Sequence, residues 1–441
     1  MNFLLLNSPI YRNHTKISED YLPPLGLAYI ATHLNNSGVN TVIVDCVSER
    51  FGVAEILELI ETKRPNFVGF NIFTQNYEIV KEVLENCSII TTFIIGGQFT
   101  KFAFNEIVQW QTKNNIWVVI GESELVLPAI VAGEYKERPL YDAGSKKVYR
   151  VDKHSKYFPH ELDEVKLDRF LLKEEYLINH YGKKEAAIIT SRGCPYNCAF
   201  CGAAHSLNQD TTIRFRSVTH VEDEIRSIFL KNSEITSIRI LDDLFLRSRE
   251  TILSAITIFE KFNCVYWRCM AQIMAFRNSM DLFPNLRASG CSELFFGIES
   301  GSSDVRKRIS KVGDTKLVED VLTGVLEAGI DVKAYFMFGF PDESTSEAEE
   351  TFKLASKLKK ISDSCLGNFR TSVFQFRPYH GTRLYNEIKK SGKIIDRIGS
   401  NDSLNVLNGR SQFNFHSGNF SNIDDCVLNE YILKTQALTE A

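Results

Sequence analysis

The feature that most constrains the fold is a pattern of short apolar runs separated by amphipathic stretches, which occurs twice along the chain. In the first 135 residues the apolar runs lie at 3–6, 41–44, 67–72, 93–95 and 117–120. Helical patterns such as 27–35 and 53–62 lie between them. Continuous apolar runs with helical crossovers predict an α/β fold with an open, mostly parallel, Rossmann-like sheet.

The second series begins near residue 186 and contains six apolar runs. They lie at 186–190, 237–241, 265–270, 293–298, 332–338 and 370–376. Helical patterns follow at 221–230, 250–262, 282–289, 317–328, 346–358 and 384–390. Six such units predict a partial (β/α)6 barrel, whose site lies at the carboxyl ends of its strands.

These patterns divide the chain into four parts. We expect a sheet domain at 1–135, a linker at 136–183, a barrel at 184–393 and a short C-terminal extension at 394–441. The linker is rich in Lys, Glu, Asp, Tyr and His, and the extension is polar apart from one helical stretch, 427–438. We find no internal repeat and no low-complexity segment.

Charge and cysteine content restrict the class of protein. The net charge of −4 predicts no nucleic acid or other general polyanion as a partner. We find no apolar run long enough to span a membrane and no basic start of a signal peptide. Without a secretory signal, the ten cysteines predict no disulfide framework, so a cytoplasmic setting is expected. Seven of them are scattered and are interpreted as small buried side chains: Cys46, Cys87, Cys264, Cys269, Cys291, Cys365 and Cys426.

The other three cysteines form a C-x3-C-x2-C loop directly after the first barrel strand, at Cys194, Cys198 and Cys201. Three thiolates on one loop can each bind one iron of a [4Fe–4S] cluster, which leaves the fourth iron open to a small molecule. A structural zinc site needs four ligands, and His205 could complete one, so zinc remains the alternative. The position of the loop, ahead of five more strand–helix units, favours the cluster.

The loop 194–201 resembles the cluster loop of radical S-adenosylmethionine (SAM) enzymes. In that family SAM chelates the open iron, and one electron from the cluster breaks a C–S bond to give methionine and a 5′-deoxyadenosyl radical. Motifs at later strand ends also resemble those of the family, and they lie at 240–245, 296–302, 338–344 and 377–382. The resemblance covers about residues 185–392.

This resemblance implies specific contacts with SAM. Asp242 or Asp243 would pair with the SAM amine, and Glu299 would accept the ribose hydroxyls. Gly297 and Gly339 would allow the backbone to approach the ligand closely. The alternatives are a helix N-cap for the two aspartates and a solvated surface position for Glu299.

Two positions depart from the family pattern. Gln272 stands where an arginine is often found, which leaves the partner of the SAM carboxylate open, with Arg268 or Arg306 as substitutes. His380 stands where proline is usual, and we favour a neutral replacement over a group that faces the substrate.

The first domain resembles the cobalamin-binding domain that precedes many radical SAM enzymes. Strand-end glycines would form a shelf for the corrin ring, and Thr74 and Gln98 would donate hydrogen bonds. The residues that the resemblance assigns to this cofactor are Pro24, Gly26, Asp45, Thr74, Gly96, Gly97, Gly121 and Glu122. Val47 occupies the position where one version of the domain has a cobalt-ligating histidine, which implies base-off, His-off binding. A domain that has lost cobalamin is the alternative.

Together the two resemblances imply a class B-type radical SAM methyltransferase, which methylates an unactivated carbon. In that scheme cobalamin takes a methyl group from one SAM, and a second SAM supplies the radical that activates the substrate. The alternatives are a cobalamin-assisted radical cyclase or rearrangement enzyme, and a cobalamin-binding sensor with a non-catalytic barrel. The expected partners are a small-molecule or peptide substrate and an electron donor such as a flavodoxin or ferredoxin.

Overall fold

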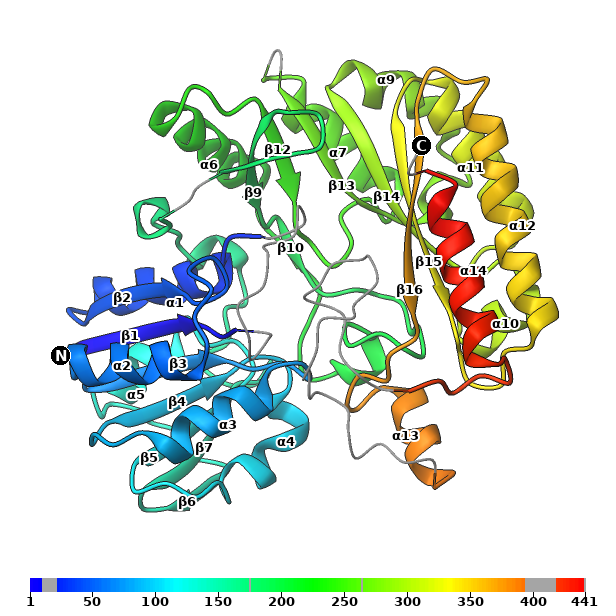
Figure 1. Cartoon of the computed structure of the whole chain (residues 1–441). Coiled ribbons are helices and arrows are strands. Elements are labelled where there is room, and N and C mark those ends of the chain that lie inside the picture. The colour runs from blue at the N-terminus through cyan, green and yellow to red at the C-terminus, as the bar shows by residue number, and fades with distance from the viewer. Residues whose placement is uncertain (10–21, 174–175, 263–264, 393–417, 440–441) are drawn as a thin grey trace.

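The computed structural model describes residues 1–9, 22–173, 176–262, 265–392 and 418–439. Two sheets dominate it, one in the blue and cyan N-terminal half of the chain and one in the green to orange C-terminal half (Figure 1). The predicted fold class, an open parallel sheet followed by a partial barrel, is confirmed. No helix within the described residues is long and apolar enough to cross a membrane.

The N-terminal sheet has the strand order β2-β1-β3-β4-β5-β7-β6, and all neighbours are parallel except β6 and β7. Its five predicted strands are β1 (Asn2–Asn7), β2 (Asn40–Asp45), β3 (Phe67–Asn71), β4 (Thr92–Gly96) and β5 (Asn115–Ile120). The crossover helices are α1 (Leu25–Asn36), α2 (Val53–Lys63), α3 (Tyr77–Asn86), α4 (Thr100–Ile107) and α5 (Val126–Val131).

This sheet is covered on both faces. Side chains of α1 and α5 pack in one core with Phe3 and Leu5, whereas α2, α3 and α4 pack in another with Leu4 and Leu6. Alternate residues of one strand therefore enter opposite cores, which explains why the strand is apolar throughout.

The C-terminal sheet curls as a partial barrel with the order β16-β15-β14-β13-β12-β9-β8. The six predicted strands are β9 (Lys184–Ile188), β12 (Ser237–Ile240), β13 (Tyr266–Ala271), β14 (Cys291–Glu299), β15 (Asp331–Phe338) and β16 (Phe369–Gln375), all parallel. Its helices are α6 (Val218–Lys231), α7 (Arg249–Phe259), α8 (Ile273–Phe276), α9 (Phe283–Ala288), α10 (Ser303–Arg308), α11 (Thr315–Glu327), α12 (Thr345–Ser362) and α13 (Arg383–Lys390).

The segment interpreted as a linker contains strands that belong to both sheets. β6 (Tyr141–Ala143) and β7 (Lys146–Arg150) extend the first sheet, and β8 (Tyr176–Ile178) pairs with β9 in the second. Between them lie 3-10 turns at Leu162–Glu164 and Arg169–Leu171. The four-part division of the chain remains a proposal. In it, residues 136–183 connect the two sheets and also add strands to both.

The last helix, α14 (Asp425–Ala437), lies between α12 and β16 (Figure 1). Its Leu428, Tyr431 and Ile432 are buried in the main core of the barrel. Residues 393–417, which the expected C-terminal extension includes, lie outside the described part of the chain.

Candidate functional site

The three-cysteine loop begins at the carboxyl end of β9 and faces the N-terminal domain. Its first residues form β10 (Ser191–Arg192), which pairs with β11 (Arg214–Phe215). Main-chain hydrogen bonds hold its middle against the barrel, from Ala199 N to Ile309 O at 2.9 Å and from Leu384 N to Ala199 O at 3.0 Å. The loop therefore has a fixed backbone on which thiols can be presented.

All three thiols are free and partly accessible. Burial raises the pKa of Cys194 and Cys198. The pKa of Cys201 is raised to about 12, mainly by burial and to a smaller extent by the charges of the neighbouring thiolates. The thiols therefore lie close enough to interact, and bound iron would replace their protons.

Within the described residues, no three His, Cys, Asp or Glu side chains converge as the ligands of a single ion. A structural zinc site would require the three cysteines and His205 to surround one ion. His205 is exposed. A cubane cluster does not require such convergence, because each thiolate binds a different iron. The donor set and its spacing therefore fit a cluster.

Asp242 anchors the start of the cysteine loop through hydrogen bonds. Its buried carboxylate accepts hydrogen bonds from Thr190 N, Thr190 Oγ1 and Ser191 Oγ, each at 2.6 Å. Neighbouring Asp243 is exposed and accepts one hydrogen bond, from Gly193 N at 3.2 Å. Neither aspartate caps a helix, since Ser248 caps α7. Of the two candidates for the SAM amine, Asp243 has more free acceptor capacity than Asp242, because it accepts one hydrogen bond and Asp242 accepts three.

Glu299 ends β14 and is buried, not a solvated surface residue. Its backbone is left-handed (φ 67°) and follows a register shift between β14 and β15, which turns the side chain out of the strand alternation. Oε1 accepts a hydrogen bond from Lys311 Nζ at 3.1 Å. A Cβ on Gly297 would collide with both groups, so this glycine makes room for the pair. Gly339, whose φ is positive, follows β15 at the same edge.

Lys311 is a site residue that the sequence did not reveal. Its side chain is 9% exposed, and its ammonium lowers the pKa of Cys198 against the larger effect of burial. A cation therefore lies between the glutamate and the cysteine loop. A lysine two residues before a glycine on a short loop carries no sequence signal, and only the fold brings it to this place.

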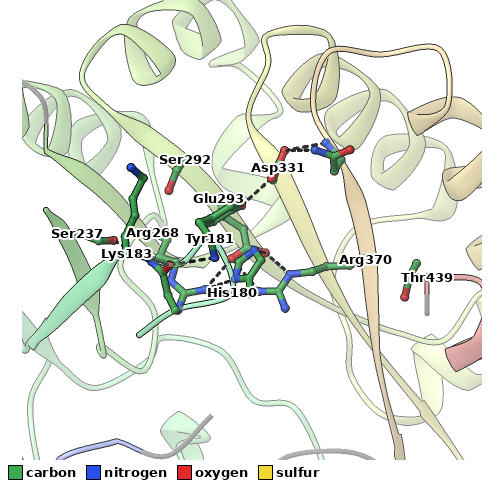
Figure 2. Close-up of polar contacts among 12 residues, drawn as sticks. His180, Tyr181, Lys183, Ser237, Arg268, Ser292, Glu293, Asp331, Arg370 and Thr439 are labelled. Carbon is green, nitrogen blue, oxygen red and sulfur yellow. Dashed lines mark hydrogen bonds and ion pairs between the residues drawn. The ribbon is translucent and has the colours of Figure 1, made fainter. Parts of the chain in front are cut away.

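Arg268, one of two arginines considered for the SAM carboxylate, lies in the barrel away from the cysteine loop. It donates to Glu185 Oε2 at 2.6 Å and to Glu293 Oε2 at 3.0 Å, and Arg370 completes the group from β16 (Figure 2). Both arginines thus neutralise buried carboxylates. This assignment of Arg268 was wrong, because strand register directs it to those carboxylates.

Arg306 is also fully engaged. Its guanidinium donates to the carbonyl oxygens of Ile298, Ser300, Val312 and Gly313, at 2.6 to 3.2 Å. Five N–H groups are the whole donor capacity of an arginine, and all are used here. Arg306 therefore shapes the loop that carries Lys311, and it has no donor left for a ligand.

Removing the Glu293 carboxylate is expected to destabilise the barrel in a pH-dependent way. Burial opposes ionisation, but Arg370 and Arg268 lower the Glu293 pKa from 4.5 to about 2. The contribution of the Glu293 carboxylate to the free energy of unfolding is therefore complete above pH 4.5 and is lost as the pH falls through about 2. At pH 7 we expect Glu293→Gln to lower the free energy of unfolding by about 3–5 kcal/mol, measured by urea denaturation. Equal stability of parent and variant at pH 7 would contradict this role.

In the N-terminal domain, Asp45 ends β2 beside Asn7 and the following loop. Its Oδ1 accepts from Asn7 Nδ2 at 2.7 Å and from Val47 N at 3.1 Å. Its Oδ2 is buried without a hydrogen-bond partner among the described residues, and burial raises the pKa of Asp45. An orphaned buried oxygen at a strand end fits a ligand that donates a hydrogen bond there.

Thr74 and His380 meet between the two domains. Thr74 Oγ1 lies 3.3 Å from His380 Nδ1, and the histidine ring packs edge-on against Phe99 at 4.7 Å. Burial lowers the pKa of His380 to about 4, so it is neutral at pH 7. His380 therefore serves the domain interface, and the hydroxyl of Thr74 is already engaged there.

Two of the strand-end glycines are required by the fold itself. Gly97 and Gly121 have φ values of 102° and 99°, and a Cβ at either would collide with the backbone of Ile72 or Val151. A Cβ on Gly96 would make only ordinary contacts, with Ser123 and Phe70. Gly26 lies exposed in the first turn of α1, and Pro24 precedes that helix. The glycines alone are therefore weak support for a corrin shelf.

Glu122 has arginine partners. Its carboxylate pairs with Arg192, at the root of the cysteine loop, and with Arg214 of β11. Glu124 pairs with Arg192 at 2.6 Å. The structure thus gives Glu122 a contact between domains in place of the predicted cofactor contact.

The remaining cysteines differ in burial. Cys46, Cys87, Cys269 and Cys291 are buried, as predicted, whereas Cys365 is partly accessible and Cys426 is exposed. The prediction was wrong for these last two, which lie after α12 and in the first turn of α14. Cys264 lies outside the described residues.

Comparison with known families agrees with this geometry. Residues 188–355 match the radical SAM superfamily, and residues 17–131 match the B12 binding domain. The chain is therefore a radical SAM enzyme with an N-terminal B12-binding domain. Solved proteins of the same fold bind such cofactors: OxsB is described with aqua-cobalamin and SAM, and TsrM with cobalamin and a [4Fe–4S] cluster.

Individual relatives cover most of the chain. An uncharacterized methyltransferase, PH0819 of Pyrococcus horikoshii, is 27% identical over 393 residues, which is 87% of this chain and 82% of the relative. An anaerobic magnesium-protoporphyrin IX monomethyl ester cyclase of Rubrivivax gelatinosus is 23% identical, over 91% of this chain and 76% of the cyclase. The solved radical SAM methyltransferase TsrM of Kitasatospora setae has the same fold, with a TM-score of 0.64, 17% identity, and coverage of 88% of this chain and 76% of TsrM.

Proposed function

We propose that the enzyme methylates an unactivated carbon of a small molecule or peptide, using SAM and cobalamin. The observation that carries the proposal is that a cysteine loop of cluster type faces a B12-binding domain across one interface. When bound, the cluster supplies the electron that cleaves SAM, and cobalamin supplies a carrier for the methyl group. The relatives named as methyltransferases support this reaction.

The chain's own residues would bind and orient the cofactors. Cys194, Cys198 and Cys201 would hold the cluster, and Asp243, with spare acceptor capacity near the loop, would accept from the SAM amine. Lys311 would pair with the SAM carboxylate in place of Arg268 and Arg306.

The backbone and the N-terminal domain would complete the binding sites. Glu299 would accept the ribose hydroxyls, and Gly297 and Gly339 would allow close backbone approach. In the N-terminal domain, Asp45, Gly96, Gly26 and Pro24 remain the proposed contacts for cobalamin. An electron donor such as a flavodoxin or ferredoxin would reduce the cluster.

Glu299→Ala is expected to weaken SAM binding and to spare the cluster. A lost hydrogen bond to a buried ligand hydroxyl costs roughly 1–3 kcal/mol, which is about 5- to 150-fold in Kd. Equilibrium dialysis with SAM and iron analysis would measure the two effects separately. Glu319→Ala is the matched control, because it removes a carboxylate–lysine pair from the outer helices. Unchanged SAM affinity in Glu299→Ala would remove this residue from the proposed site.

Methylation itself is tested with SAM that carries a CD3 group. The reduced holoenzyme would be incubated anaerobically with a metabolite extract of the organism that encodes it, and products would be screened by mass spectrometry. We expect a product that is 17 mass units heavier than its precursor, because CD3 replaces hydrogen. SAM consumption with no label in any product would contradict the proposal.

Cobalamin is expected to bind without a protein nitrogen on cobalt, because Val47 offers no ligand. His33, a histidine of the same domain, already accepts from Lys166 N at 3.0 Å through Nε2. His14 lies outside the described residues. The bound Co(II) form should give an electron paramagnetic resonance (EPR) spectrum without nitrogen superhyperfine splitting. Clear nitrogen coupling would contradict base-off, His-off binding, and a folded protein that takes up no cobalamin would contradict the methylation proposal.

The second candidate is a radical cyclase, favoured by the similarity to the cyclase of Rubrivivax gelatinosus along 91% of this chain. A cyclase would consume SAM without passing on its methyl group, so the CD3 experiment separates the two functions.

A further inference from the structure

A cluster of charged residues joins the N-terminal domain to the root of the cysteine loop. Arg192 reaches two carboxylates at once, Glu122 through Nη1 and Glu124 through Nη2, the latter at 2.6 Å. Arg214 contacts both oxygens of Glu122 and also donates to Pro159 O. We name these four side chains, Arg192, Arg214, Glu122 and Glu124, the interdomain clamp.

Each half of the clamp is rigidly mounted. Arg192 and Arg214 are directly paired across β10 and β11, and Arg192 precedes Cys194 by only two residues. Glu122 and Glu124 follow Gly121, whose left-handed backbone is pressed against Val151 at the end of β5. A displacement of the β5 loop would therefore be transmitted to the first cluster cysteine through very few bonds.

The clamp is also largely withdrawn from solvent. The Glu124 and Arg214 side chains are each 7% exposed, and those of Glu122 and Arg192 are 15% and 22% exposed. Two arginines side by side repel each other, and the two carboxylates offset that repulsion. Buried ion pairs contribute little net stability compared with apolar packing, and their best-attested use is to fix one arrangement among several. Planar bidentate contacts of arginine with carboxylates add directional specificity.

We propose that Arg192 is a positioning residue, which fixes the cysteine loop against the strand ends of the B12-binding domain through Glu122 and Glu124. The two cofactors are then held in one relative placement, as a reaction that uses both of them requires. The inference depends on the cluster and cobalamin being bound, and it does not depend on whether the product is methylated or cyclised.

The test is a distance measurement between the two cofactors in the holoenzyme. Dithionite reduction gives paramagnetic Co(II) and a paramagnetic cluster, and pulsed EPR reports the dipolar coupling between them. We expect one narrow distance distribution in the parent protein. In Arg192→Gln and in Glu124→Gln it should broaden or shift, while iron and cobalamin contents stay at the parental level. Arg192→Lys keeps the positive charge but cannot bind two carboxylates at once through a planar guanidinium. Its distance distribution should lie between those of the parent and Arg192→Gln.

Arg169→Gln is the matched control, because Arg169 forms a buried pair with Glu224 that does not touch the cysteine loop. It should lower stability and leave the distance unchanged, which separates positioning from general folding. SAM cleavage should fall roughly 10- to 100-fold in Arg192→Gln, the cost of misplacing reacting groups. Distance distributions in both glutamine variants that match the parent would overturn the proposal, as would a parent that binds no cobalamin. Absence of a methylated product would leave the distance result unaffected and would count only against methylation.

Discussion

Replacement of Cys194, Cys198 and Cys201 together with alanine is expected to remove the cluster completely and to leave the fold in place. We propose these three thiols as the cluster ligands, so without them the loop should hold no iron. The backbone of the loop does not depend on the thiols, because Ala199 is bound to Ile309 and Leu384 through main-chain groups. After anaerobic reconstitution, the iron content per chain should fall from about four to none, as measured by iron and sulfide analysis. The far-ultraviolet circular dichroism spectrum should be unchanged.

Cys291→Ala is the control for this experiment. Cys291 is fully buried in β14, where it packs in the barrel core away from the loop. The variant should be less stable and should retain the full iron content. A triple variant that keeps its iron and brown colour would contradict the assignment of the cluster ligands.

Replacement of Asp242 with alanine is expected to have the next largest effect, although in the described part of the chain its hydrogen bonds go to Thr190 and Ser191 and not to a cysteine. Its carboxylate satisfies three donors of Thr190 and Ser191 at the start of the loop. Each buried donor left without a partner costs roughly 1–3 kcal/mol, so the loss should amount to several kcal/mol. We expect a lower Tm and a clear loss of iron per chain.

The adjacent aspartate provides the comparison for this prediction. Asp243→Ala removes one longer hydrogen bond, to Gly193 N, from an exposed carboxylate. It should keep the parental Tm and iron content while weakening SAM binding. If Asp242→Ala matches the parent in Tm and iron, the anchoring role is wrong.

Strands and the cysteine loop could be predicted because their signals are local. A strand covered on both faces, such as β1, is apolar throughout, and the spacing of Cys194, Cys198 and Cys201 lies within eight residues. The strands β6 to β8 were missed because they are only three to five residues long. They are strands because they pair with neighbours: β6 with β7, β8 with β9, and β7 also with the more distant β5. Pairing, not composition, makes them strands.

The partners of charged residues could not be predicted, because they come from distant segments. Arg268 was a plausible ligand for SAM until the strand register placed Glu185 and Glu293 beside it. Glu122 likewise finds Arg192 seventy residues away. Burial of Glu299 depends on an irregularity of β14, and Lys311 reaches it only through the loop that Arg306 shapes. No periodicity in the sequence encodes contacts of this kind.

The most direct test of the central claim is whether the enzyme cleaves SAM reductively. The holoenzyme would be incubated anaerobically with SAM, dithionite and the metabolite extract, and nucleosides would be quantified by liquid chromatography with mass detection. A radical SAM enzyme should yield 5′-deoxyadenosine and methionine, and the triple-cysteine variant should yield neither. A protein that holds its full cluster and binds SAM but forms no 5′-deoxyadenosine would contradict the account.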